Sequence, residues 1–158
     1  RTRGEWVDSL LASMIKSNEA ASIVARETQA NAVTDVTGFG LAGHLLEILD
    51  ASELNAEVQL SNLPLLPGAK QLLQEGLEST LAPANRETAI RTKCAHESTT
   101  NSPEFAALFD PQTSGGLLLS ISPEEEQRLH NQLNDAGVDA WTIGRFLESS
   151  TQPTLNLV

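Results

Sequence analysis

Apolar residues recur every three or four positions in several segments of the chain, the spacing of amphipathic helices. The clearest case is residues 5–16, where Trp6, Leu10 and Met14 fall on one line, and we expect this face to pack into the core. A second helix is expected from Asn18, its cap, to Thr28. Similar spacing predicts further helices over residues 41–49, 69–76, 103–109 and 123–136.

Runs of β-branched or alternating apolar residues predict five strands between these helices. They cover residues 32–36, 56–60, 117–121, 141–146 and 154–158. Residues 77–100 show no sustained period and leave room for a sixth strand; loops of this length inside compact domains are usually functional or mobile. Strands separated by helices, with two strands in succession at the end, predict an α+β fold with a mixed β-sheet layered with helices.

The composition fits one globular domain. At 158 residues the chain can bury a proper core, and its 40% hydrophobic and 20% charged residues are ordinary values. A formal net charge of −11 argues against a nucleic-acid groove and against an anionic membrane surface. The single cysteine, Cys94, excludes an internal disulfide. We expect no membrane span and no signal peptide, and hence a cytoplasmic protein.

The most informative stretch is residues 33–41, Val-Thr-Asp-Val-Thr-Gly-Phe-Gly-Leu. A short strand ends near Asp35, breaks at Gly38 and Gly40 and leads directly into a helix. Such a junction directs backbone N–H groups and a partial positive charge at whatever lies above it, which favours an anion. Because Asp35 adds a hard oxygen ligand, the stretch predicts a corner that binds magnesium and phosphate.

Two other interpretations of Asp35 remain open. It could cap the following helix, with the glycines only permitting a tight turn. It could also be a nucleophile, since Asp-x-Thr opens aspartyl-phosphate sites as well. That chemistry usually recruits a lysine, and Lys16, Lys70 and Lys93 lie on no strand-end motif.

A second glycine-rich turn, Asp-Pro-Gln-Thr-Ser-Gly-Gly at residues 110–116, precedes the predicted strand 117–121. The two motifs in this order, together with Gly43-His44, the Leu-Pro-Leu-Leu-Pro-Gly stretch at 63–68 and Asn85-Arg86, resemble the C-terminal half of selenophosphate synthetase (selenide, water dikinase). The resemblance covers nearly the whole chain. It implies an α/β/α sandwich that is partly ferredoxin-like.

The resemblance also implies a function. The intact enzyme would make selenophosphate from selenide, ATP and water, with Mg²⁺ and ATP as cofactors and a homodimer as its assembly. Asp35 carries over as a metal ligand, and Thr37, Gly38 and Gly40 would line the phosphate-facing turn. For the second motif, Asp110, Thr113, Ser114, Gly115 and Gly116, we expect a structural role where two domains close. Asn85 and Arg86 could reach a phosphate or simply lie in a solvated loop, and a packing role is expected for His44.

We expect the chain to be one C-terminal domain, residues 1–158, of a longer enzyme. The reactive Cys or selenocysteine, its lysine and the glycine-rich ATP-binding segment would lie in an N-terminal domain that this sequence lacks, so no catalytic residue is assigned here. Two alternatives remain: the C-terminal domain of another ATP-dependent synthetase with the same plan, or a docking module without catalytic residues. On this view the domain alone folds but is inactive.

Overall fold

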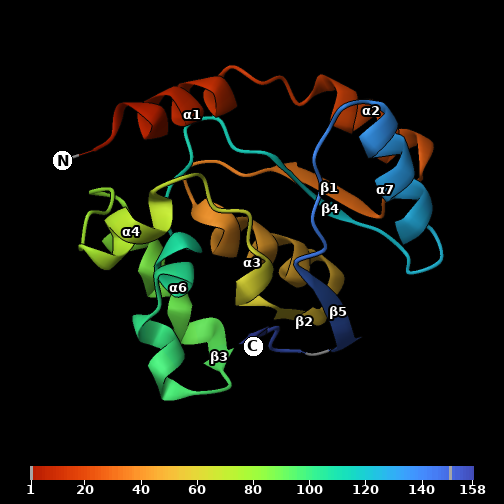
Figure 1. The fold of residues 1–158 in the computed structure, drawn as a ribbon. Coiled ribbons are helices and arrows are strands. Elements are labelled where there is room, and N and C mark those ends of the chain that lie inside the picture. The colour runs from red at the N-terminus through yellow and green to blue at the C-terminus, as the bar shows by residue number, and fades with distance from the viewer. Residues whose placement is uncertain (1, 150) are drawn as a thin grey trace.

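The computed structural model describes residues 2–149 and 151–158. Its helices and strands are mixed along the chain, which begins with two helices and ends with two strands (Figure 1). The α-helices are α1 (Gly4–Met14), α2 (Glu19–Glu27), α3 (Gly40–Ser52), α4 (Ala69–Gln74), α5 (Ala82–Asn85), α6 (Pro103–Ala107) and α7 (Glu126–Asp135). The strands are β1 (Ala32–Asp35), β2 (Leu54–Val58), β3 (Thr92–Cys94), β4 (Leu117–Ser120), β5 (Gly144–Ser149) and β6 (Leu155–Leu157). Short 3₁₀ turns cover Leu60–Asn62, Arg86–Arg91 and Glu97–Asn101.

The strands form two sheets. Strands β1 and β4 make an antiparallel pair, while the other four lie in the order β3-β6-β2-β5. In the larger sheet β5 runs antiparallel to β2, whereas β6 runs parallel to both β2 and β3. The predicted α+β class with mixed pairing is therefore confirmed, and β3 is the sixth strand for which the segment 77–100 left room.

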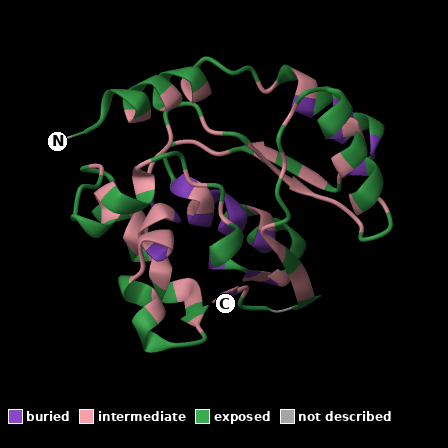
Figure 2. Cartoon of the chain, viewed as in Figure 1, coloured by how far each residue is buried: buried purple, intermediate pink, exposed green. Residues whose placement is uncertain are grey.

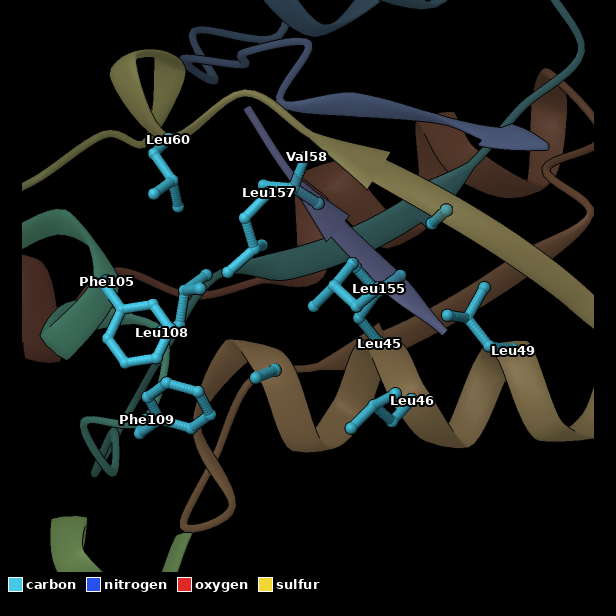
Figure 3. Packing of buried hydrophobic residues seen from close by; sticks show 12 residues of the cluster. Leu45, Leu46, Leu49, Val58, Leu60, Phe105, Leu108, Phe109, Leu155 and Leu157 are labelled. Atoms are coloured by element: carbon cyan, nitrogen blue, oxygen red, sulfur yellow. The ribbon is translucent and has the colours of Figure 1, made fainter. Parts of the chain in front are cut away.

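The main core lies between α3 and the larger sheet (Figure 3). Leu45 and Leu49 from α3 pack towards Leu155 and Leu157 of β6, and all four are at most 5% exposed. Phe105 and Phe109 close one end of this core, with their rings edge to face and the centroids 5.1 Å apart. Such an aromatic pair adds to the gain from burial alone. This core fixes the position of α3, and with it the glycine turn that precedes the helix.

A second, smaller core joins α2 and α7 to the outer strand pair. It contains Ala21 and Val24 from α2 and Leu129 and Leu133 from α7, packed against apolar residues around β4. Figure 1 shows these two helices next to each other at the β1–β4 end of the molecule. This core braces the two-stranded sheet that carries both sequence motifs.

Helix α1 does not pack as the sequence predicts. None of its residues is buried, and Figure 2 shows the helix without a buried position. Its apolar face is open: Leu10 is 46% and Leu11 54% exposed, and Ile15, just beyond the helix, is 85% exposed. The expectation that residues 5–16 contribute to the core is therefore wrong for this chain. Trp6 lies against Gly68, but no residue of α1 is buried.

Several details of the elements also differ from the prediction, among them the strand expected over 56–60, which is β2 at Leu54–Val58, and the helix expected from residue 123, which begins at Glu126. The strand expected over 141–146 begins only at Gly144, and Trp141 is 56% exposed. Asn18 occupies the cap position of α2 but makes no capping hydrogen bond, since its side chain bonds elsewhere, as described below. None of the helices in the described residues is both long and apolar enough to cross a membrane.

Candidate functional site

The two sequence motifs lie side by side, although some 75 residues separate them along the chain. In the β1–β4 pair, Asp35 stands opposite Leu117. The backbone N–H of Val36 donates to the carbonyl of Gly116 at 3.0 Å, and the N–H of Gln112 donates to the carbonyl of Thr37 at 3.0 Å. The second motif therefore runs along the first and holds the strand end that carries Asp35.

Gly115 makes this close approach possible. A Cβ atom at this position would lie 2.2 Å from the carbonyl oxygen of Val36, a distance that no side chain tolerates. Its own carbonyl accepts a hydrogen bond from the Asn18 side-chain amide at 3.0 Å, which ties the start of α2 to the motif. The expected tight approach of two backbones at the second motif is thus present, and it occurs between the two motifs of this domain.

Asp35 ends β1 with its side chain exposed to solvent. Within the described residues its carboxylate has no hydrogen bond or ion pair of its own. It does not cap α3, whose cap residue is Phe39 and whose cap has no side-chain hydrogen bond. The capping alternative for Asp35 is therefore wrong.

The nucleophile alternative also lacks support. Lys16 lies 3.6 Å from Asp139, and Lys70 forms an ion pair with Glu104 at 2.6 Å. Lys93 lies exposed on β3, at the edge of the other sheet. Within the described residues no ion pair or hydrogen bond joins any of these lysines to Asp35, so the lysine that aspartyl-phosphate chemistry recruits is not seen at this carboxylate.

Asp35 fits a metal site only as one of several contributors. The described part of the chain contains no group of three or more His, Cys, Asp or Glu side chains that could hold a metal ion. Mg²⁺ does not need such a group, because it usually keeps several waters and binds one or two carboxylates together with substrate phosphates. A free, exposed carboxylate at the end of a strand meets that requirement.

The turn between Asp35 and α3 is shaped by its glycines. Gly40 has a φ of +69°, and a Cβ there would lie 2.8 Å from the carbonyl oxygen of Leu108. The same carbonyl accepts a hydrogen bond from the Ala42 N–H at 2.9 Å, and the Gly40 N–H donates to Thr37 at 3.1 Å. The N–H of Gly40 is therefore used inside the chain, as is that of Thr37, which donates to His44. Thr37 and Gly40 shape the turn rather than offer their N–H groups to an anion.

His44 holds this turn from the inside. It is 7% exposed, and its Nε2 accepts a hydrogen bond from the Thr37 N–H at 3.0 Å, with the Thr37 hydroxyl oxygen at the same distance. The ring of Phe39 lies edge to face on His44, with the centroids 5.8 Å apart. Gly43 leaves room for Phe39, because a Cβ atom added at Gly43 would lie 2.7 Å from the Cβ of Phe39. The expected packing role of His44 is confirmed.

Asn85 holds the same turn through the carbonyl of Gly38. Its side-chain amide donates to the carbonyl of Gly38 at 2.8 Å and to that of Phe109 at 3.0 Å, which joins α5 to the first motif and to the residue before the second. Arg86 pairs with Glu78 instead of standing free in a solvated loop. The sequence marked this pair of residues, but it could not show that Asn85 bonds two backbone carbonyls that are 71 residues apart in the chain.

Asp110 is the titratable group of this region with a perturbed pKa. Burial, the largest effect, raises the pKa of its carboxyl above the ordinary value, and the nearby charge of Glu78 raises this pKa further. Two hydrogen bonds lower the pKa in part, one from Gln112 Nε2 at 3.1 Å and one from the backbone of Ser79. Thr113, Ser114 and Gly116 are exposed. The second motif therefore presents a small polar surface beside the Asp35 turn.

Comparison of the sequence with known proteins identifies relatives of this chain. Residues 6–153 match the family model described as "AIR synthase related protein, C-terminal domain". A selenide, water dikinase of Shewanella sp. (strain MR-7) is 39% identical over 146 residues, which is 92% of this chain and 40% of the relative. The enzyme of the same name from Nitratidesulfovibrio vulgaris (strain DSM 19637 / Miyazaki F) is 39% identical over 132 residues, 83% of this chain and 37% of the relative. The chain thus spans about two fifths of the length of these curated relatives.

Proposed function

The chain belongs to the family of AIR synthase related proteins, as their C-terminal domain, and on that premise we propose that it is part of an enzyme that makes selenophosphate from selenide, ATP and water. The proposal is supported by the names of its relatives and by the pairing of the two motifs around Asp35. The remaining part of the relatives would contribute the reactive residue, its lysine and most of the ATP site. The complete enzyme would be a cytoplasmic homodimer.

Asp35 carries the chemical part of the proposal. Phosphoryl transfer depends mainly on positioning and on neutralising charge, so a carboxylate that holds Mg²⁺ against the phosphates is central to it. The ion, when bound, would neutralise phosphate charge, with Asp35 as its ligand from this domain. Thr37, Gly38 and Gly40 form the turn that sets the direction of this carboxylate, and His44 and Asn85 hold the turn.

The domain also has a docking function in this proposal. Its described residues lack a metal cluster of their own, and the apolar face of α1 is open. An open apolar face of this kind is typical of a surface that meets another domain. We expect that surface, and the exposed residues Thr113, Ser114 and Gly116 of the second motif, to face the remainder of the enzyme. By itself the domain should fold but form no AMP from ATP and selenide.

The decisive substitution is Asp35→Asn in the full-length protein. Asn keeps the shape of the side chain but removes its charge, so we expect selenide-dependent AMP formation to fall by roughly two to three orders of magnitude. The melting temperature should stay within a few degrees, since the carboxylate is exposed and has no partner in the described chain. Asp135→Asn, which removes an exposed carboxylate from α7, is the matched control and should leave activity unchanged.

Retained activity in the Asp35→Asn protein would refute the metal-binding role. A different outcome would favour another synthetase of the same superfamily: the full-length protein would consume ATP in an Asp35-dependent manner that does not respond to selenide. Measuring AMP and ADP with and without selenide separates these two results.

A further inference from the structure

We propose that His44 is a positioning residue for Asp35, which it orients through the backbone of Thr37. The inference rests on the proposed function, because it assigns to His44 a role in the site that Asp35 would form. It concerns a contact inside this domain, between the middle of α3 and the turn that precedes it.

The hydrogen bonds determine the state of the imidazole. A backbone N–H can only donate, so the Nε2 atom that receives the Thr37 N–H at 3.0 Å must be unprotonated. In the neutral ring the proton is then on Nδ1. The Oε2 atom of Glu47 lies 3.3 Å from Nδ1 but without hydrogen-bond alignment, so its carboxylate acts on this N–H mainly as a nearby negative charge.

The same contact fixes the backbone two residues after Asp35. On one side Asp35 is held by the pairing of β1 with β4, including the hydrogen bond from Val36 to Gly116. On the other side the chain is held at Thr37 by His44. If the acceptor on His44 is lost, the partly buried Thr37 N–H loses its partner. The turn keeps the hydrogen bonds to the carbonyls of Thr37 and Gly38 but is less firmly held, so we expect the carboxylate of Asp35 to shift.

The surroundings of His44 leave the ring little freedom. It is 7% exposed, it directly precedes the buried residues Leu45 and Leu46 on α3, and the Phe39 ring contacts it edge to face. A packing role alone would need only the volume of the ring. The acceptor at Nε2 goes beyond that need, because it receives the N–H of Thr37, a backbone donor of the turn between Asp35 and the helix.

A second histidine in the chain offers a matched comparison. His130 on α7 also has its Nε2 3.0 Å from a threonine hydroxyl, that of Thr142. There the hydroxyl donates to Glu126 Oε1 at 2.6 Å, and the ring accepts no backbone N–H in the described structure. His130 belongs to another part of the molecule and has no connection to Asp35, so its substitution controls for the loss of a histidine–threonine contact.

The test uses the full-length protein and three variants. His44→Leu keeps an apolar side chain but removes the acceptor, whereas His44→Gln keeps an acceptor near the position of Nε2; His130→Leu is the control. The quantity to measure is the Mg²⁺ concentration at half-maximal selenide-dependent AMP formation. Residues that orient a metal ligand typically change metal affinity by 10- to 100-fold, so we expect a rise of roughly that size for His44→Leu, recovery in His44→Gln and no change in His130→Leu.

Nitrogen NMR of the ¹⁵N-histidine-labelled full-length protein gives a readout that does not depend on activity. We expect His44 to show a protonated Nδ1 and an unprotonated Nε2. A protonated Nε2 would overturn the proposal, and so would equal Mg²⁺ dependence of His44→Leu and the wild type. If His44→Leu does not fold, the Mg²⁺ dependence of His44→Gln decides: a value close to the wild type supports the proposal, and a loss as large as that of Asp35→Asn contradicts it.

The Asp35→Asn protein separates this inference from the proposed function. If Asp35→Asn is inactive while the His44 variants respond to Mg²⁺ as the wild type does, only the role of His44 is refuted. If Asp35→Asn is fully active, the metal-binding role of Asp35 fails and the positioning role of His44 fails with it, although the NMR result would still report the Thr37–His44 hydrogen bond. If the full-length wild type forms no AMP in response to selenide, the proposed function itself fails.

Discussion

Helices α1 and α3 have similar apolar patterns but opposite surroundings. Six residues of α3 are buried, among them Leu45, Leu46 and Leu49, whereas α1 has none (Figure 2). Both helices have apolar residues at helical spacing, and α1 even carries a tryptophan and a methionine. The comparison teaches that periodicity identifies an apolar helix face, but not the surface against which that face is buried.

The connections of the two helices explain the difference. Helix α3 lies between β1 and β2 with short links on both sides, so the chain must fold it back onto a sheet. Helix α1 is followed by α2, and its Trp6 side chain lies against Gly68. With no strand directly attached, its apolar face depends on a surface elsewhere.

The strongest test of this contrast replaces one leucine in each helix. Leu49→Ala removes a side chain that is 0% exposed from the main core, and we expect a loss of about 2–5 kcal/mol in the free energy of unfolding. Leu11→Ala removes one that is 54% exposed, and its effect should stay within about 0.5 kcal/mol. Urea unfolding of this chain measures both; equal losses would show that α1 is packed after all.

The next test concerns the motif region, which contributes through backbone contacts rather than apolar burial. Gly115→Ala would place its Cβ against the Val36 carbonyl, and we expect a loss of about 1–3 kcal/mol. Gly116→Ala is the matched control, because nothing lies within 4 Å of the added atom. If the two variants are equally stable, the close pairing of the two motifs is not tight in solution.

A smaller effect on stability, but a clear one on association, is expected from α1. Replacing Leu11 and Ile15 together by serine removes exposed apolar surface, so the free energy of unfolding of this chain should change by less than about 1 kcal/mol. Any concentration-dependent self-association, measured by analytical ultracentrifugation, should decrease. In the full-length protein the same double variant should unfold at a lower temperature, and an unchanged value there would argue against docking through α1.

The smallest effect is the pH dependence expected from Asp110. Because burial raises its pKa in the folded protein, the ionised carboxyl costs stability at neutral pH. This cost disappears as the pH falls through the folded pKa, where the native state takes up the proton before the unfolded chain does. Asp110→Asn should therefore be slightly more stable than the wild type at pH 7, with the difference vanishing near pH 3. A stability difference that grows on acidification would have the opposite sign and contradict this account.

The sequence by itself determined the elements and the two motifs. Periodicity located most helices and most strands because side-chain spacing is a local property, and the strand–glycine–helix order around Asp35 was visible for the same reason. The glycines indicated a close backbone approach, which Gly115 makes with Val36. The family resemblance, carried by the same residues, agrees with the match over residues 6–153.

Only the tertiary structure decided which groups meet. It divided the strands into two sheets and left the apolar face of α1 exposed. It also showed that the Asn18 side chain, expected to cap α2, donates a hydrogen bond to the Gly115 carbonyl instead. It further showed that His44 and Asn85 both hold the Asp35 turn, at the N–H of Thr37 and at the carbonyl of Gly38. These contacts join residues that are distant in the chain or depend on the direction of one side chain. Neither the spacing nor the type of the residues encodes them, because hydrogen bonds form wherever the packed core brings a donor to an acceptor.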